Sequence, residues 1–217
     1  MDRRFIAILV AIVLIAGGVF WFARPNKASN TSSSSHAQPS NHVTGKGTKN
    51  VTLIEYGDYQ CPACGAYYPV VKQLVAQYEN DIFFQFRNFP LTQIHQNAFA
   101  GARAAEAADK QGKYWEMHDL LYEGQQDWGT SAAPLSFFDN YAKSLSLDMT
   151  KFHADYQSQA VNDVINADIN EGKKIGANST PTFVLEGKKI EENPRDVQSF
   201  SDLIQAEIDK KNPPANQ

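Results

Sequence analysis

Cys61 and Cys64 are the only cysteines in the 217-residue chain, and they stand two residues apart in the stretch VTLIEYGDYQCPACGAYYPVVKQL. Four uses of such a pair are conceivable. A structural zinc site commonly needs four ligands, but no second pair exists and His95, His118 and His153 are scattered. A disulfide closing so short a loop constrains little of the unfolded chain, and free core thiols need no particular position. Reversible thiol–disulfide chemistry is the remaining use.

The position of the pair favours that redox use. We expect Cys61 at the N-cap of a helix, because Pro62 suits the first helical position. The amides of Ala63 and Cys64 then point toward the Cys61 sulfur, and the helix dipole favours its thiolate. Cys64, one turn further in, is within reach of Cys61 and better shielded from water, so it can resolve a mixed disulfide.

An acidic residue precedes the pair. Glu55 stands in an otherwise apolar strand six residues before Cys61. Burial there would raise its pKa toward neutrality and allow proton exchange with Cys64 or a bound water. A solvated sheet edge is the alternative for Glu55. Asp58, on the turn after the strand, is expected to make a local turn or cap hydrogen bond.

The third candidate feature is the Thr180-Pro181 dipeptide at the start of the apolar segment TFVL. Proline in a strand pattern loses a ladder hydrogen bond, so it requires an edge position or a cis peptide. A cis bond would expose the backbone of Thr180 to a passing peptide. A trans proline opening the strand is the alternative on these residues alone.

The elements around these residues predict an α/β fold. NVTLIEY and DIFFQFRNFPL are typical of buried strands, and residues 61–78 carry apolar side chains at helical spacing. Strand, helix and strand form a βαβ unit. Residues 93–158 lack strand signals and predict three or four short helices, one of them capped by Asp148.

The C-terminal part returns to a mixed pattern. A helix in QAVNDVINADINEGKKI is expected to end at Gly176. The segment TPTFVLEGKKI predicts a hairpin that turns at Glu186-Gly187. Asn193-Pro194 is expected to open a last helix.

The N-terminal segment predicts membrane attachment. Residues 5–23 carry no charged side chain and are long enough to cross a bilayer as a helix. Bulky residues at 20–22 disfavour signal-peptide cleavage, so we expect an uncleaved anchor. Residues 24–42 are rich in Ser, Asn and Thr and predict a flexible linker, in which His36 and His42 are expected to be solvated.

Composition limits the function classes. The chain is 42% hydrophobic, enough for one globular domain with a substantial core beside the N-terminal attachments. Its formal net charge is −4, and no cluster or stripe of Lys and Arg appears. Nucleic acid is therefore a poor candidate partner.

Several of these segments together resemble the DsbA-like disulfide oxidoreductases of the thioredoxin superfamily. The resemblance is carried by VTLIEYGDYQCPAC, by NFPL followed by IHQNA, by AAEAADKQGKYWEMHDLLYE and by STPTFVLEGKKI. It extends from about Val43 to Ile208, nearly the whole domain. Two departures concern oxidising strength: the dipeptide Pro62-Ala63 lacks the histidine of strongly oxidising members, and Thr180 stands where those members often have valine.

The resemblance implies a thioredoxin fold interrupted by a helical domain, with Pro181 as a cis-proline beside the cysteines. It implies that Cys61 is the nucleophile, Cys64 the resolving thiol and Glu55 the buried acid, with Thr180 and Pro181 contacting the substrate. The expected organisation is a transmembrane anchor at 1–23, a linker at 24–42, a thioredoxin-fold domain at 43–92 and 159–217, and an inserted helical domain at 93–158.

We therefore predict a membrane-anchored thiol:disulfide oxidoreductase whose domain lies outside the cytoplasm, where disulfides persist. Its clients would be unfolded exported proteins, and a membrane redox partner would reoxidise the pair. The protein is expected to be a monomer that needs no metal and no cofactor beyond the Cys61–Cys64 disulfide. A reductase or isomerase, and a non-catalytic peptide-binding chaperone module, are the alternatives.

Overall fold

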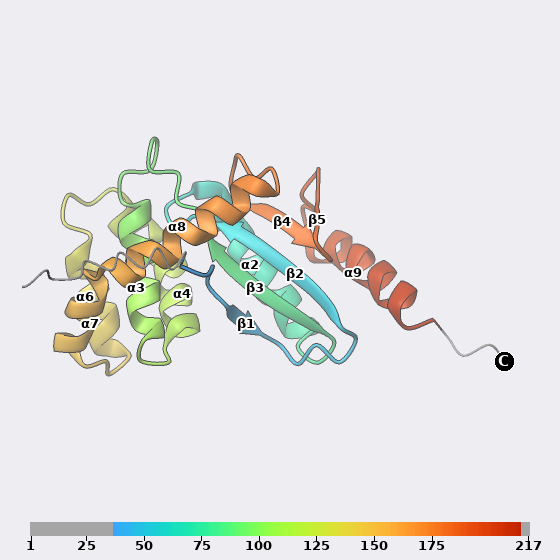
Figure 1. Ribbon diagram of the computed structural model, residues 1–217, viewed down its shortest axis with the longest axis horizontal. Coiled ribbons are helices and arrows are strands. Elements are labelled where there is room, and N and C mark those ends of the chain that lie inside the picture. Colours follow the sequence, from blue (N-terminus) through green and yellow to red (C-terminus); the bar gives the residue numbers. More distant parts are fainter. Residues whose placement is uncertain (1–36, 214–217) are drawn as a thin grey trace, which may run out of the picture. The chain divides into compact units, whose positions relative to one another are not determined.

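The computed structural model describes residues 37–213, and their centre is a five-stranded sheet (Figure 1). Its spatial order is β1-β3-β2-β4-β5. The parallel pair β2 and β3 forms the middle, while β1 runs antiparallel to β3 and β4 runs antiparallel to β2 and β5. The strands are β1 (His42–Thr44), β2 (Val51–Gly57), β3 (Ile82–Asn88), β4 (Thr182–Leu185) and β5 (Lys188–Lys189).

The predicted βαβ unit is confirmed. Helix α2 (Pro62–Gln77) joins β2 to β3, with Cys61 at its N-cap in an extended conformation and Pro62 in its first turn. The helix buries Cys64, Val71 and Leu74. This register follows from the apolar spacing of the sequence, and it fixes which cysteine faces the core.

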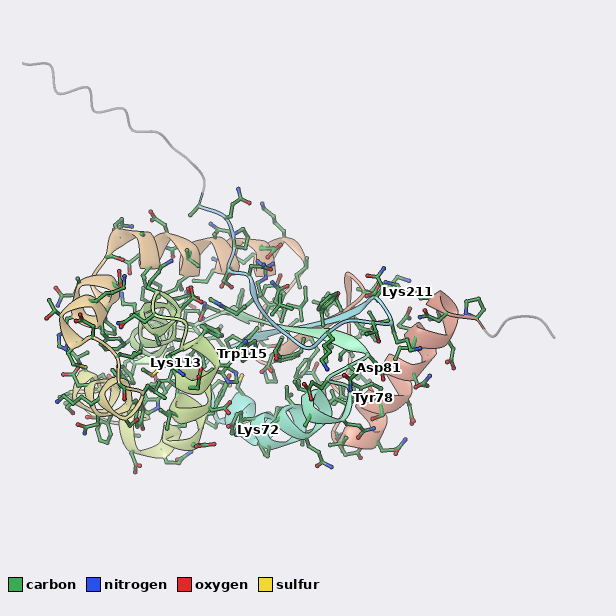
Figure 2. All side chains as sticks on the ribbon, turned by 90° about the horizontal axis from the view of Figure 1, so that it is seen from below. Lys72, Tyr78, Asp81, Lys113, Trp115 and Lys211 are labelled. Carbon is green, nitrogen blue, oxygen red and sulfur yellow. The ribbon has the colours of Figure 1, made fainter. Side chains whose placement is uncertain are left out.

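Helices cover both faces of the sheet. Helices α2 and α9 (Val197–Lys211) lie on one face, and α8 (Gln159–Lys174) lies on the other (Figure 2). Residues 93–158 form five helices where three or four were expected: α3 (Ala98–Asp109), α4 (Tyr114–Glu123), α5 (Gln125–Gly129), α6 (Leu135–Ser144) and α7 (Met149–Tyr156). The additional element is the five-residue α5, too short to show periodicity.

One hydrophobic core joins the sheet to these helices. Its fully buried members include Leu53 and Phe86 from the sheet and Trp128, Phe138 and Phe152 from the helices. Burying a side chain of this size contributes roughly 1.5–3 kcal/mol each. Shared packing therefore holds the helices of residues 93–158 against the sheet whose central strand β2 leads into the cysteines.

The expectation of a solvated His42 in a flexible linker is wrong. His42 opens β1, is 8% exposed, and its Nε2 lies 2.8 Å from a Glu106 carboxylate oxygen. Burial opposes protonation of the ring, but the carboxylates of Asp109 and Glu106 outweigh it and raise the pKa of His42 to about 9.

Ser40 also belongs to the domain rather than to a linker. Its amide and its hydroxyl donate to the two carboxylate oxygens of Asp168 on α8, at 2.7 and 2.8 Å. The composition of this segment indicates a linker because Ser and Asn are typical of linkers. The hydrogen bonds that hold it, from Ser40 to Asp168 and between His42 and Glu106, join residues more than sixty positions apart. His36 lies outside the described residues.

Two local predictions hold, and the start of the last helix differs from the prediction. Asp148 caps α7 by accepting the amide of Lys151. The C-terminal hairpin turns at Glu186 and Gly187, both with positive φ. Helix α9, however, begins at Val197 behind the N-cap Asp196, not at Asn193-Pro194. The Asn193 side chain instead donates to the carbonyl of Pro181 at 2.8 Å.

The predicted membrane anchor at residues 5–23 lies outside the described residues. Between residues 37 and 213, every helix falls short of the length and apolar character that a bilayer span requires.

Candidate active site

The turn between β2 and α2 positions the two cysteines. Asp58 shapes it: one carboxylate oxygen accepts the amide of Gln60 at 2.8 Å, and the Asp58 carbonyl accepts the amide of Cys61 at 3.0 Å. The expected local hydrogen bond of Asp58 is thus present. Gly57 must lack a side chain, because a Cβ there would meet the ring of Phe86 at 2.4 Å.

The cysteines are close together, unbonded, and in different environments. Cys61 is 6% exposed and Cys64 is fully buried. The Cys61 sulfur lies 3.5 Å from the carbonyl oxygen of Thr180. The peptide bond between Thr180 and Pro181 is cis. The sequence left both a cis and a trans bond open at this position.

The Cys61 thiolate is strongly stabilised. A hydrogen bond from the Cys64 thiol has the largest effect on the pKa of Cys61 and lowers it, while burial opposes this effect. Hydrogen bonds from the Thr180 side chain and from the amides of Cys64 and Ala63 lower the pKa further, to about 5. Opposite effects act on Cys64, whose pKa is raised by burial, by the shared hydrogen bond and by the charge of Glu55. At neutral pH one sulfur is therefore a thiolate and the other a thiol.

Glu55 lies in the middle of the sheet, not at a solvated edge. It is 3% exposed and stands opposite Phe86 on β3 and Phe183 on β4. Burial raises its pKa to about 8, and the negative charge of Cys61 adds to this. Glu55 is therefore mostly protonated at neutral pH, but close enough to its pKa to exchange its proton.

Two polar residues of the helical segment also support the site, although no sequence motif marks them as site residues. Gln125 donates to the carbonyl oxygens of Tyr59 and Cys61, at 2.8 and 2.9 Å. His95, placed only among scattered histidines, lies with its Nδ1 2.7 Å from the Asp58 carboxylate. Gly65 leaves room for Gln125, because a Cβ at position 65 would lie 2.4 Å from the Gln125 side-chain oxygen.

This arrangement suits two-electron thiol–disulfide exchange. A stabilised thiolate, a shielded thiol one turn away and a protonatable acid behind them are the parts that the reaction needs. Within residues 37–213, no three His, Cys, Asp or Glu side chains are grouped so that they could hold a metal ion.

The fold and site define a thioredoxin-like protein whose structural neighbours are DsbA-like oxidoreductases. The family description "Thioredoxin" matches residues 37–206, and the chain belongs to this family.

Two solved structures illustrate the likeness. One is a thioredoxin-like oxidoreductase from Silicibacter pomeroyi DSS-3, with 28% identity and a TM-score of 0.64 over 76% of this chain and 90% of that one. The other is oxidised BdbD from Bacillus subtilis, with 24% identity and a TM-score of 0.67 over 80% of this chain and 97% of that one. The second likeness concerns the fold alone.

The curated relatives are named as antiporters and are much longer than this chain. The Na(+)/H(+) antiporter NhaA 1 of Salinispora arenicola is 36% identical over 148 residues, which are 68% of this chain but 22% of the antiporter. The chain thus spans between 22% and 34% of the length of these curated relatives. Most of each antiporter lies outside the comparison.

Proposed function

We propose that this protein is a thiol:disulfide oxidoreductase that introduces or exchanges disulfide bonds in exported proteins through Cys61 and Cys64. The observation that carries the proposal is the inequality of the two sulfurs. Cys61, the more accessible one, is a thiolate beside the backbone of Thr180, whereas Cys64 is a buried thiol. In this proposal Cys61 attacks and leaves, and Cys64 closes the intramolecular disulfide.

The clients in this proposal are unfolded or partly folded polypeptides. Thr180 and Pro181 would contact them, because the Thr180 carbonyl lies beside the Cys61 sulfur. A client disulfide formed at the expense of the pair leaves it reduced, so a membrane redox partner must reoxidise it. We propose that the catalytic domain acts as a monomer on the extracytoplasmic side.

The direction of electron flow is tested by the reduction potential of the pair against glutathione. Thiolate stabilisation favours the reduced form, so we expect a value between about −120 and −270 mV, together with catalysed oxidation of reduced ribonuclease. A value below about −270 mV, or a pair held reduced by a membrane donor, would assign the protein to the reductases. A Cys61→Ser/Cys64→Ser variant that still assists folding would point to a chaperone module instead.

Membrane attachment is proposed from residues 5–23, which are uncharged throughout. We expect protein recovered from membranes to retain residues 1–23, and carbonate washing to leave it there. N-terminal sequencing is the measurement. A mature chain that begins near Ala23 or within the linker would contradict an uncleaved anchor.

A further inference from the structure

A cleft of about 480 Å³ lies between α8 and residues 89–93, the segment that follows β3. In Figure 1, α8 leads into the short loop that enters β4, and Ala177 and Asn178 of this loop complete the lining. Binding sites for small ligands commonly have about 300–1,000 Å³. Neither Cys61, Thr180 nor Pro181 lines the cleft, so it is separate from the reacting sulfurs.

Side-chain amides dominate the polar lining of this cleft. Four carboxamides line it, all of them exposed: Gln93, Asn166, Asn170 and Asn178. Within residues 37–213 none of the four makes a side-chain hydrogen bond. Asn162, one turn earlier on α8 and outside the lining, differs because it accepts a hydrogen bond from Arg103 at 2.7 Å. The cleft thus presents several unused donors and acceptors to solvent.

Two of these amides stand where asparagine is unfavourable. Asn166 and Asn170 occupy interior positions of α8, four residues apart and therefore on one face of the helix. Asparagine is a poor helix former, and neither side chain contributes to the core. The two residues therefore do not serve the stability of α8, which points to a use of their amides in binding.

The walls of the cleft are held in place without a ligand. The Leu91 amide donates at 2.9 Å to the buried carboxylate of Asp58, the residue that shapes the turn before Cys61. Helix α8 contacts the opposite wall directly, because a Cβ on Gly172 would lie 2.8 Å from the ring of Phe89. A ligand that binds between such walls avoids the cost of ordering them.

A polypeptide backbone matches the chemistry of this lining. A carboxamide carries both a donor and an acceptor, so it can pair with the N–H and the C=O groups of an extended chain. Lys173 is the single charged lining residue, so the lining is not a site for a polyanion. Phe89, Leu91 and Ile169 form an apolar floor that can accept side chains of different kinds.

The position of the cleft connects it to the reacting sulfur. The Thr180 carbonyl oxygen lies 3.5 Å from the Cys61 sulfur, and Asn178 precedes Thr180 by two residues, which span at most about 7 Å. A client held on Cys61 can therefore reach the cleft within a few residues of its own cysteine. Ile94, 73% exposed and next to Gln93, adds an apolar contact at the rim.

We propose that the cleft between α8 and residues 89–93 binds the backbone of an unfolded client a few residues away from the cysteine that reacts with Cys61. The proposal rests on the proposed oxidoreductase function and adds a second contact to it. Because the amides pair with peptide units, this contact is independent of client sequence. A folded product has its backbone groups paired internally and cannot make the contact, so it is released.

The first test measures exchange between the oxidised protein and reduced peptides that contain one cysteine. A short capped peptide is compared with peptides extended on one side or the other by about six residues, roughly 20 Å of extended chain. One of the two extensions should raise the second-order rate constant about tenfold, equally for Ala, Ser and Thr extensions. N-methylation of the extension removes its N–H donors and should abolish the gain. Equal rates for short and extended peptides, or a gain that survives N-methylation, would overturn the proposal.

Matched variants of α8 locate the contact. Asn166→Ala/Asn170→Ala should lose the gain with the extended peptide and keep the wild-type rate with the short one. Alanine favours the helix, so this variant should fold. Gln159→Ala/Asp163→Ala, an exposed hydrogen-bonded pair on α8 outside the lining, is the control and should keep the gain. A gain that Asn166→Ala/Asn170→Ala retains would place the contact elsewhere and overturn the proposal.

Photo-crosslinking shows the occupied surface directly. An extended peptide with a benzophenone side chain is trapped on Cys61 in the Cys64→Ser protein, irradiated and mapped by mass spectrometry. Cross-links should fall in residues 89–93 and 166–178. Cross-links confined to other segments, such as α9, would overturn the proposal.

The outcomes separate the cleft from the function on which it rests. A wild type that exchanges with no peptide would end the oxidoreductase function. A wild type that reacts equally with short and extended peptides would end the proposal for the cleft alone. A capped hexaalanine without cysteine should compete with the extended peptide. Competition by maltohexaose but not by hexaalanine would assign the cleft to carbohydrate and overturn the proposal.

Discussion

Iodoacetamide added to the reduced protein at pH 6 should modify Cys61 at least about 100-fold faster than Cys64. Cys61 is the thiolate at this pH because its pKa is about 5, whereas burial and the neighbouring negative charges raise the pKa of Cys64. Mass spectrometry of the quenched protein measures the difference. The Cys61 rate should fall below about pH 5 as the thiolate is protonated.

Substitutions of the partner cysteine test the cause of this inequality. The hydrogen bond from Cys64 has the largest effect on the Cys61 pKa, so Cys64→Ala should raise that pKa well above 5. Cys64→Ser should raise it less, because a hydroxyl still donates. Cys64→Ser should also accumulate mixed disulfides with clients, and Cys61→Ser should form none. Equal labelling of both sulfurs, or equal trapping, would contradict the assigned roles.

Replacing Glu55 should make the protein more stable and less active. Burial raises the Glu55 pKa from 4.5 to about 8, so between these pH values the folded protein binds more protons than the unfolded chain. This group therefore lowers the free energy of unfolding as pH rises through that window. Glu55→Gln removes the dependence, and at pH 7 it should raise the free energy of unfolding by as much as about 3 kcal/mol.

Urea unfolding of reduced protein at pH 4, 5.5, 7 and 8.5 measures this effect. The two proteins should match at pH 4 and diverge above it, while an exposed control, Glu192→Gln, should follow the wild type throughout. Thiol exchange by Glu55→Gln should be about tenfold slower or more near neutral pH. A constant stability difference from pH 4 to 8.5, or unchanged exchange rates from pH 5 to 9, would remove Glu55 from this role.

The gain and the loss have one origin. The neutral amide that Glu55→Gln introduces avoids the cost of ionising a carboxyl between Phe86 and Phe183, but it cannot exchange a proton with Cys64. In the proposed function, the carboxyl group of Glu55 therefore lowers the stability of the fold but allows proton exchange. Such trade-offs are common where a site needs a perturbed group.

The local elements around the site were predictable from sequence because their causes are local. Apolar spacing places Cys64 on the buried side of α2, and a proline in the first turn leaves Cys61 at the N-cap. The β4–β5 hairpin depends on two adjacent residues that adopt positive φ, Glu186 and Gly187. Each of these signals lies within a few residues of the structure that it specifies.

The remaining features depend on contacts between residues far apart in the chain. His42 joins the domain only because Glu106, 64 positions later, accepts its hydrogen bond, and Gln125 reaches the Cys61 carbonyl across 64 positions. The sequence left both isomers of the Thr180–Pro181 bond open, because the intrinsic preference between them is only about 0.5–1 kcal/mol. The cleft between α8 and residues 89–93 exists only once α8 packs against Phe89. The residues that can do the chemistry are thus recognisable from the sequence, but their environment is not, because burial and charge depend on packing between distant parts of the chain.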